Sequence, residues 1–253
     1  MKNDALRVLL AEVGQTRLVT GVAGFIGSQI LETLLHADRR VVGLDNFATG
    51  QRGNLETVRR AMNEQRWSRF RFMGNELYAD VFRRAYALST IGLRYFNVFG
   101  PRQDPSGAYA AVIPRWVGNL LRGDACIMNG DGETRRDVCF VDNAVQANVR
   151  AALTTSPVAI NQVYNVSVGD RTTLNRLFGL VRDGLIARRS ADKSLARATP
   201  VYRGFQPGDV RHSQADIEKT RTLLGYEPTH DVAAGLAVAL DWHASELPGS
   251  GWA

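Results

Sequence analysis

The sequence predicts an α/β fold with a doubly wound parallel sheet. Over the first 73 residues, short apolar segments alternate with amphipathic ones in the order strand, helix, strand, helix, strand. A glycine-rich turn directly follows the first strand, and an acidic residue, Asp45, ends the second. Together these features are typical of the nucleotide-binding half of such a sheet.

Hydrophobic periodicity places the elements of this half. Strands are expected where apolar runs are short, and helices where apolar residues recur every three or four positions, as between Ser28 and His36. The predicted strands are 17–20, 40–45 and 69–73. The predicted helices are 1–16, 28–36 and 54–65.

The alternation becomes less regular after Gly74. A turn-rich loop is expected over 97–105, and a Gly-Asp-Gly turn separates two short strands further on. The remaining predicted strands are 90–96, 127–132, 136–141 and 163–167. The remaining predicted helices are 75–86, 109–121, 142–153, 173–186, 214–224 and 232–243.

Composition narrows the class of protein. The chain has 253 residues, 45% hydrophobic and 22% charged, which suits one large or two small globular domains and not a disordered or coiled-coil chain. No apolar run approaches the roughly 18 residues of a membrane span, and the charged N-terminus makes a poor signal peptide. Two cysteines cannot form a disulfide framework, so we expect a protein of the reducing cytoplasm.

The charge balance does not predict a nucleic-acid-binding protein. The 31 basic and 25 acidic residues give a formal charge of +6, but 28 of the basic residues are arginines scattered along the chain. A nucleic-acid footprint requires basic residues clustered on one face. The arginine excess favours anionic small ligands instead.

The glycine-rich turn has the spacing Gly21-x-x-Gly24-x-x-Gly27. Gly21 permits a tight turn, Gly24 allows the backbone to approach a pyrophosphate, and Gly27 allows the helix to lie close to the sheet. The N–H groups that begin the helix then hold the negative charge. An ordinary strand–helix turn is the alternative interpretation.

Asp45 is the candidate ribose-binding acid. A carboxylate at the end of the second strand accepts hydrogen bonds from both ribose hydroxyls and repels a 2′-phosphate. Because Asn46 follows it and not an arginine, NAD is predicted over NADP. The alternative is a turn residue at the end of a strand.

Five segments resemble the extended short-chain dehydrogenase/reductase family of NAD-dependent epimerases and dehydratases. They are 18–28, 43–50, 93–100, 129–134 and 208–213. Segments 100–114 and 208–216 are most similar to bacterial UDP-N-acetylglucosamine 4-epimerases. The resemblance covers about residues 5–245. It implies a Rossmann-type sheet, NAD as cofactor, and epimerisation of a UDP-sugar through a 4-keto intermediate.

The resemblance also implies two sets of binding residues. Those for NAD are Gly21, Ala23, Gly24, Phe25, Ile26, Gly27, Asp45, Asn46, Thr49, Gly50 and Tyr95. Those for the UDP-sugar are Asn97, Ala108, Val112, Ile127, Met128, Asn129, Arg136, Arg211 and Ser213. In the second set, Arg136 and Arg211 would neutralise the diphosphate, and Ile127 to Asn129 would flank the uracil. The small Ser213 would leave room for an N-acetyl group.

Each substrate residue also has a simpler interpretation. Beside Asp137, Arg136 would by itself predict a surface ion pair, and Asn97 a loop cap. The family usually has an arginine where Gln206 stands here, so Arg203 is a candidate to replace that diphosphate contact.

The family's catalytic Ser or Thr and Tyr-x-x-x-Lys pair are missing. The chain passes directly from Met73 through Gly74 to Asn75, where the family has two more strand–helix units, and none of its three lysines follows a tyrosine by four positions. We therefore predict no catalytic residue, no metal ligand and the loss of about two central strands, which leaves unpaired sheet edges. The helix pair of the family's homodimer is expected to be damaged as well.

The predicted organisation follows from these points. Residues 1–100 are expected to form a truncated NAD-binding domain, and 101–253 mainly a smaller α/β lobe that binds the UDP-sugar, with about 136–168 returning to the sheet. Two functions remain open: an internally deleted, inactive 4-epimerase, or a non-catalytic protein that binds NAD or UDP-sugar, alone or with an intact paralogue. No nucleic acid or membrane is expected as a partner.

Overall fold

The computed structural model describes residues 16–45, 47, 50–73, 91–103, 112–160, 162–189, 193–205 and 210–246. The chain groups into two compact units. The first unit comprises 1–94, 142–164 and 218–229, and the second comprises 95–141, 165–217 and 230–253. Each unit therefore combines segments that are far apart in the sequence.

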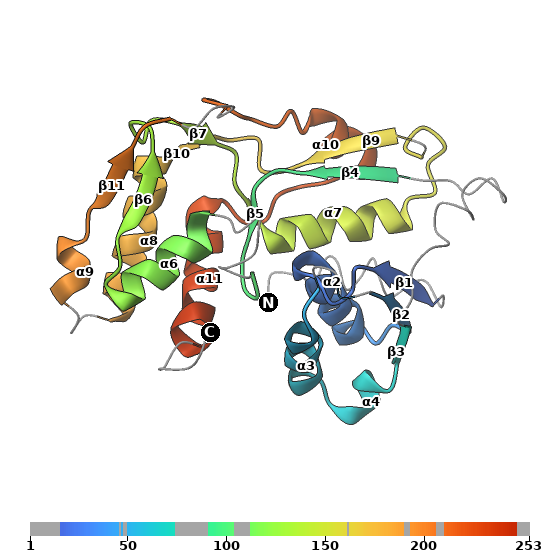
Figure 1. Cartoon of the computed structure of the whole chain (residues 1–253). Coiled ribbons are helices and arrows are strands. Elements are labelled where there is room, and N and C mark those ends of the chain that lie inside the picture. Colours follow the sequence, from blue (N-terminus) through green and yellow to red (C-terminus); the bar gives the residue numbers. More distant parts are fainter. Residues whose placement is uncertain are drawn as a thin grey trace. The chain divides into compact units, whose positions relative to one another are not determined.

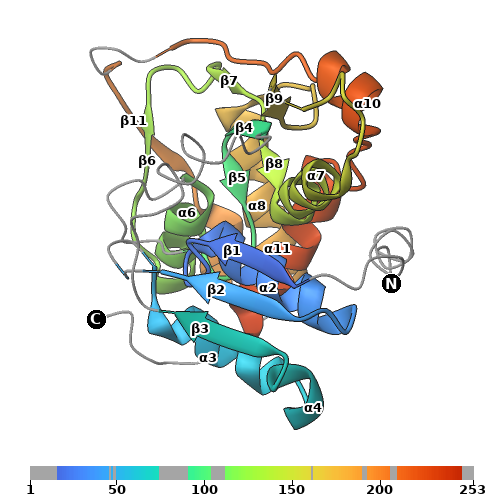
Figure 2. The same cartoon turned by 90° about the vertical axis from the view of Figure 1, so that its right-hand side faces the viewer.

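The first unit contains a parallel three-stranded sheet in the order β1 (Arg17–Thr20), β2 (Val41–Leu44) and β3 (Phe70–Met73) (Figure 2). Helix α2 (Phe25–His36) packs on β1 and β2 and contacts α3 (Arg52–Ala61). Because α2 buries Leu31, Leu34 and Leu35 at helical spacing, its apolar face lies on the sheet. This is the strand–helix alternation that the sequence predicts.

Helix α7 (Val141–Leu153) completes the core of this unit. Its Val145 and Val149 belong to the same buried cluster as Val19 of β1 and Leu31 of α2. A second cluster joins strands β4 (Ile91–Tyr95) and β9 (Gln162–Val166) to helix α10 (Glu218–Leu224) through Tyr164 and Leu224. Figure 1 shows α7 running alongside β4 and β9.

Strand β1 lies at the outer edge of its sheet among the residues that the structure describes. Strand β4 pairs with β9 in a separate two-stranded sheet and not with β1. Leu18 of β1 is 61% exposed, and a cavity of about 190 Å³ lies between β1, α2 and α7. The fold is thus a truncated Rossmann-type α/β fold whose sheet is split into two parts.

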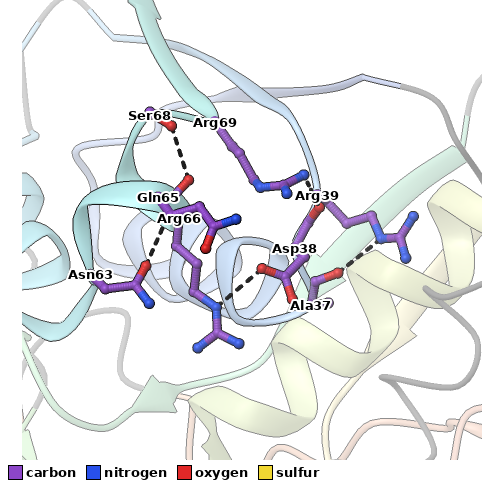
Figure 3. Close-up of polar contacts among 8 residues, drawn as sticks. All are labelled: Ala37, Asp38, Arg39, Asn63, Gln65, Arg66, Ser68 and Arg69. Carbon is purple, nitrogen blue, oxygen red and sulfur yellow. Dashed lines mark hydrogen bonds and ion pairs between the residues drawn. The ribbon is translucent and has the colours of Figure 1, made fainter.

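A polar cluster joins the turn after α2 to the turn before β3 (Figure 3). Asp38 has a positive φ of 58°, and its Oδ1 accepts a hydrogen bond from Arg66 Nε at 3.2 Å. Its carbonyl oxygen accepts another from Arg69 Nη1 at 3.0 Å. Arg66 belongs to the short helix α4 (Glu64–Trp67), which Asn63 caps by accepting the Arg66 N–H. These bonds connect the segments that precede β2 and β3.

The described residues of the second unit form three pairs of short strands. The pairs are β5 (Val98–Phe99) with β8 (Cys139–Phe140), β6 (Cys126–Asn129) with β11 (Pro200–Arg203), and β7 (Arg135–Arg136) with β10 (Thr172–Thr173). Helix α8 (Leu174–Arg188) packs against α6 (Val112–Arg122), α9 (Lys193–Arg197) and α11 (Val232–Glu246).

Several predicted elements differ from the structure. The helix expected over 54–65 ends at Ala61 and restarts at Glu64 because Asn63 caps a new helix. The strand expected over 136–141 is divided between β7 and β8, and the helix expected over 214–224 begins only at Glu218. Strands β5, β10 and β11 and helix α9 were not predicted. The helices predicted over 1–16 and 75–86 lie outside the described residues, except for residue 16.

Within the described part of the chain, no helix combines the length and apolar character needed to cross a membrane.

Candidate nucleotide-binding sites

The glycine-rich turn leaves β1 at Thr20 and enters α2 at Phe25. Gly21 has a φ of +66°, and its carbonyl oxygen accepts the Gly24 N–H at 2.9 Å. A Cβ atom on Gly27 would lie 2.0 Å from that same carbonyl oxygen. The turn is therefore so tight that position 27 tolerates only glycine.

The start of α2 is open to an anion. Gly24 is the N-cap and supplies no side-chain hydrogen bond, and the first turn contains no acidic residue. The first helical N–H groups, those of Phe25, Ile26 and Gly27, meet no capping side chain from Gly24. Such N–H groups, reinforced by the helix dipole, favour a phosphate.

Asp45 is 6% exposed and bonds to the loop itself. Its Oδ2 accepts the Ala23 N–H at 2.8 Å, and its Oδ1 accepts the Phe47 N–H at 2.7 Å. A Cβ on Gly50 would lie 2.7 Å from Oδ1. Asp45 therefore has the turn role that was the alternative interpretation, while its ribose role stays a prediction, since a carboxylate has further acceptor sites.

Two residues that the sequence analysis missed hold the other side of this loop. The Ala23 carbonyl oxygen accepts the Gln51 N–H at 2.9 Å and Asn54 Nδ2 at 2.8 Å. Both donors belong to the start of α3, so the first turn of α3 supports the glycine-rich turn. The predicted cofactor residues Asn46 and Thr49 lie outside the described residues, and Tyr95 belongs to the second unit.

A cavity of about 580 Å³ in the second unit brings together most of the predicted substrate residues. Its volume is within the range typical of small-molecule sites. The predicted residues that line it are Asn97, Val112, Ile127, Met128, Asn129 and Arg136. Residues that line it without having been predicted for it include Arg115, Trp116, Asn119 and Thr134. Ala108 lies outside the described residues.

Helix α6 and strand β6 form one wall of this cavity. Trp116 is 2% exposed, and its indole Nε1 donates to the Ile127 carbonyl oxygen at 3.1 Å. The same ring packs edge-on against Phe178 of α8. The segment from Ile127 to Asn129, predicted to flank uracil, is thereby fixed in place.

Three arginines contribute to the lining of the cavity: Arg115, Arg136 and Arg203. Arg136 Nη1 donates to the carbonyl oxygen of Arg211 at 3.4 Å, and the Arg203 carbonyl oxygen accepts the Gly130 N–H at 2.7 Å. Guanidinium groups suit a diphosphate because they donate two parallel hydrogen bonds. Arg203 lines the cavity, and its role as a replacement for the arginine missing at Gln206 stays a prediction, since Gln206 lies outside the described residues.

Arg211 does not line this cavity. Its Nη2 forms an ion pair with Asp131 Oδ2 at 2.6 Å, and its guanidinium lies 5.3 Å from the centre of the Phe205 ring. The pKa of Asp131 is lowered by the hydrogen bond from the backbone of Glu133 and by Arg211. The ion pair engages Nη2, and a guanidinium has five N–H donors, so a role of Arg211 toward a diphosphate stays a prediction.

Ser213 and Asn97 are held by hydrogen bonds to the segment around Arg136. The Ser213 N–H donates to the Arg135 carbonyl oxygen at 3.1 Å. Asn97 has a φ of 38°, and its Nδ2 donates to the Asp137 carbonyl oxygen at 2.8 Å. Asn97 therefore has the loop-capping contact that was its alternative interpretation. A role toward a ligand stays a prediction for both residues.

The described residues contain no group of three His, Cys, Asp or Glu side chains placed to hold a metal ion. Burial raises the pKa of the Cys126 thiol to about 11, which makes it a poor nucleophile. What the arrangement can do chemically is bind anionic ligands.

The described residues form a Rossmann-type α/β fold with a glycine-rich turn after β1 in the first unit and an arginine-lined cavity in the second. Family models agree: the NAD dependent epimerase/dehydratase family matches residues 72–167, and GDP-mannose 4,6 dehydratase matches residues 18–78. The chain belongs to the NAD-dependent epimerase/dehydratase family.

Similar proteins support this assignment. A putative UDP-glucose 4-epimerase of Methanocaldococcus jannaschii is 30% identical over 172 residues, which are 68% of this chain and 51% of that protein. The UDP-glucose 4-epimerase of Mycolicibacterium smegmatis is 31% identical over 170 residues, 67% of this chain and 50% of that protein. The chain thus spans about half the length of these curated relatives.

Solved structures show the same fold. The UDP-glucose 4-epimerase of Thermotoga maritima, solved with UDP-glucose, has a TM-score of 0.70 and 27% identity, and the match covers 92% of this chain and 100% of that one. The UDP-N-acetylglucosamine 4-epimerase of Methanobrevibacter ruminantium has a TM-score of 0.74 and 24% identity, covering 92% and 99%.

Proposed function

We propose that the chain binds NAD at the glycine-rich turn of the first unit and a UDP-sugar in the cavity of the second unit. It retains the cofactor- and substrate-binding residues of a UDP-hexose 4-epimerase, but with this sequence it does not epimerise the sugar. The observation that carries the proposal is the 580 Å³ cavity, which gathers six predicted substrate residues, Arg136 among them, with two further arginines, Arg115 and Arg203. We expect it to act in the cytoplasm without the usual homodimer.

The residues present fit the adenosine–pyrophosphate half of NAD. The uncapped start of α2 provides N–H donors for the pyrophosphate. The missing Cβ atoms at Gly24 and Gly27 let the turn close tightly against the Gly21 carbonyl oxygen. The carboxylate of Asp45 disfavours a 2′-phosphate, so NAD should bind more tightly than NADP. When bound, NAD supplies a hydride acceptor. Equal or tighter NADP binding in a calorimetric titration would contradict this assignment.

Loss of turnover follows from the missing base. A tyrosine has an unperturbed pKa of about 10 and needs a neighbouring cation to act as a base at neutral pH. The sequence contains no Tyr-x-x-x-Lys, and its lysines are Lys2, Lys193 and Lys219. The remaining residues can bind and orient a UDP-sugar but cannot take the proton from its hydroxyl group.

Calorimetric titration with UDP-N-acetylglucosamine tests the binding site. We expect Arg136→Ala and Arg203→Ala each to weaken binding about tenfold, because each removes a charge-assisted contact to the diphosphate. The matched control is Arg176→Ala: Arg176 is exposed on α8 and does not line the cavity, so affinity should not change. No binding by the wild-type chain would refute the proposal.

Turnover is measured separately by NMR with UDP-N-acetylglucosamine and NAD. No C4 epimer should form, because positioned acid–base groups supply about 10²–10⁴ in rate and are missing here. Turnover of about 1 s⁻¹ or more would refute this part. Binding without turnover supports a non-catalytic binding protein, the second function that the sequence leaves open.

The choice of sugar has its own test. Ser213→Tyr should weaken binding of UDP-N-acetylglucosamine far more than binding of UDP-glucose, because the larger side chain would fill the space proposed for the N-acetyl group. Equal losses for the two ligands would exclude Ser213 as the residue that selects the sugar.

A further inference from the structure

Asp137 is a fully buried carboxylate that follows β7 in the second unit. As the neighbour of Arg136, it would be expected to form a surface ion pair, but its side chain has 0% exposure. A charge at such a position is costly unless hydrogen bonds satisfy it. The hydrogen-bond donors around the carboxylate therefore explain how a charged group is accommodated at this buried position.

Each of the two carboxylate oxygens of Asp137 accepts two hydrogen bonds. Oδ1 accepts from Ser167 Oγ at 2.5 Å and from the Val168 N–H at 3.3 Å. Oδ2 accepts from the N–H groups of Gly169 and Ala215, each at 3.1 Å. About four acceptor positions are available on a carboxylate, and here all four are used.

The backbone of Asp137 adds two more bonds. Its N–H donates to the Ser213 carbonyl oxygen at 3.1 Å, and its own carbonyl oxygen accepts from Asn97 Nδ2 at 2.8 Å. The Arg135 N–H extends the pattern by donating to the Arg211 carbonyl oxygen at 3.0 Å. The segment that Asp137 anchors thus holds three predicted substrate residues. Asn97 and Ser213 bond to the backbone of Asp137, and Arg211 bonds to the backbone of Arg135.

We propose that Asp137 is a positioning residue for the diphosphate and sugar end of the UDP-sugar site. This inference rests on the function proposed above and adds a residue that acts without touching the ligand. Through Asn97 and Ser213 it determines where the groups that would meet the diphosphate and sugar lie. Burial raises the pKa of Asp137, and the bonds from Ser167, Ala215, Val168 and Gly169 oppose this effect. Those four donors therefore favour the charged carboxylate.

The uracil end of the cavity is built independently of Asp137. Strand β6 carries Ile127, Met128 and Asn129, and it is fixed by pairing with β11 and by the Trp116 indole. A general loss of stability would lower the affinity for all ligands alike. A loss of positioning would lower the affinity only for ligands that reach the diphosphate and sugar end. The ratio of affinities for UDP-N-acetylglucosamine and for UMP separates these two cases.

The variant that tests this is Asp137→Asn. The new amide nitrogen would face N–H groups that now donate hydrogen bonds to the carboxylate oxygen. The segments around Gly169 and Ala215 should therefore move away from residue 137. We expect UDP-N-acetylglucosamine affinity to fall about tenfold and UMP affinity to fall less than about twofold, measured by calorimetry. An unchanged ratio would overturn the positioning role.

Two further variants keep the test decisive. Ser167→Ala removes one donor of the four and should change the same ratio about threefold, which decides the matter if Asp137→Asn does not fold. Leu185→Ala removes fully buried side-chain atoms from α8 at a position that does not line the cavity, so it should lower stability and leave the ratio unchanged. Absence of wild-type binding would refute the proposed function and this inference together, whereas wild-type binding with an unchanged ratio in both variants would refute the inference alone.

Discussion

The two candidate sites are built in different ways. The glycine-rich turn of the first unit is formed by one continuous segment, Gly21 to Gly27, whose shape is dictated by close backbone contacts. The end of the second unit that we propose for the diphosphate is formed by the segments around Asn97, Arg136 and Ser213. Hydrogen bonds to the backbone of Arg135 and Asp137 join these segments, and the buried Asp137 carboxylate bonds to further segments. The first site therefore depends on local sterics, and the second on a long-range polar network.

This difference predicts different responses to mutation. A locally built site is damaged by adding atoms, because the backbone has no room to yield. A network site is damaged by removing or changing a partner, because each lost bond releases a distant segment. The following predictions test this contrast, beginning with the largest effect.

Gly27→Ala should be the most damaging small change in the first unit. The added Cβ would lie 2.0 Å from the Gly21 carbonyl oxygen and 2.9 Å from Val22 Cα, both backbone atoms. We expect the free energy of unfolding to fall by about 3 kcal/mol in a denaturant titration. Gly53→Ala in α3 is the control, since its Cβ would meet nothing within 4 Å. Similar stabilities for the two variants would show that the turn is not sterically tight.

His243 should give the second unit a pH dependence of nearly the same size. Burial lowers its pKa to about 4, so the folded state keeps the imidazole neutral while the unfolded chain binds a proton below about 6.5. The free energy of unfolding should therefore fall as pH decreases from about 6.5 to 4, by about 3 kcal/mol in total.

His243→Gln isolates this effect. As pH falls through that window, the wild type should lose stability relative to the variant. Thermal or denaturant unfolding at each pH measures this difference. Leu240→Ala, at a buried position of the same helix without a titrating group, should lower stability equally at each pH and so keep the wild-type profile. Parallel profiles for wild type and His243→Gln would contradict the prediction.

Asp131→Asn should improve ligand binding in the second unit. It weakens the ion pair that now holds Arg211 Nη2 at 2.6 Å from Asp131 Oδ2 and so frees the guanidinium for a diphosphate. We expect about a threefold gain in UDP-N-acetylglucosamine affinity by calorimetry. Asp124→Asn is the control because it breaks an exposed ion pair with Arg122 away from the cavity. A loss of affinity would show that Asp131 itself supports the site.

Asp38→Asn should have the smallest effect. Arg66 lowers the pKa of Asp38 by donating a hydrogen bond, so the charged form contributes stability that is lost only as pH falls below the ordinary range of a carboxyl group. The pair is largely exposed, and asparagine tolerates the positive φ, so we expect a loss of less than about 1 kcal/mol. A loss above about 2 kcal/mol in a denaturant titration would give this turn a larger role.

The contrast between the sites also explains what could be predicted from the sequence. The strands and helix around Gly21–Gly27 were predicted because their pattern is contiguous, and the cavity residues Ile127–Asn129 followed from the resemblance to a family. The role of Asp137 could not be predicted, because its donors Ser167 and Ala215 lie 30 and 78 positions away. Likewise, the pairing of Arg211 with Asp131, 80 positions apart, has no signal in local spacing.

The placement of α7 has a consequence for the order in which the chain can fold during synthesis. Val145 and Val149 fill the core that Val19 and Leu31 begin, so 130 positions separate Val19 and Val149, the first and last buried residues of this core. Until α7 has left the ribosome, the apolar faces of β1 and α2 lack part of their cover. The first unit should therefore acquire protection from proteolysis on nascent chains only after about residue 153 has emerged, and the intervening time is when a chaperone would be most needed.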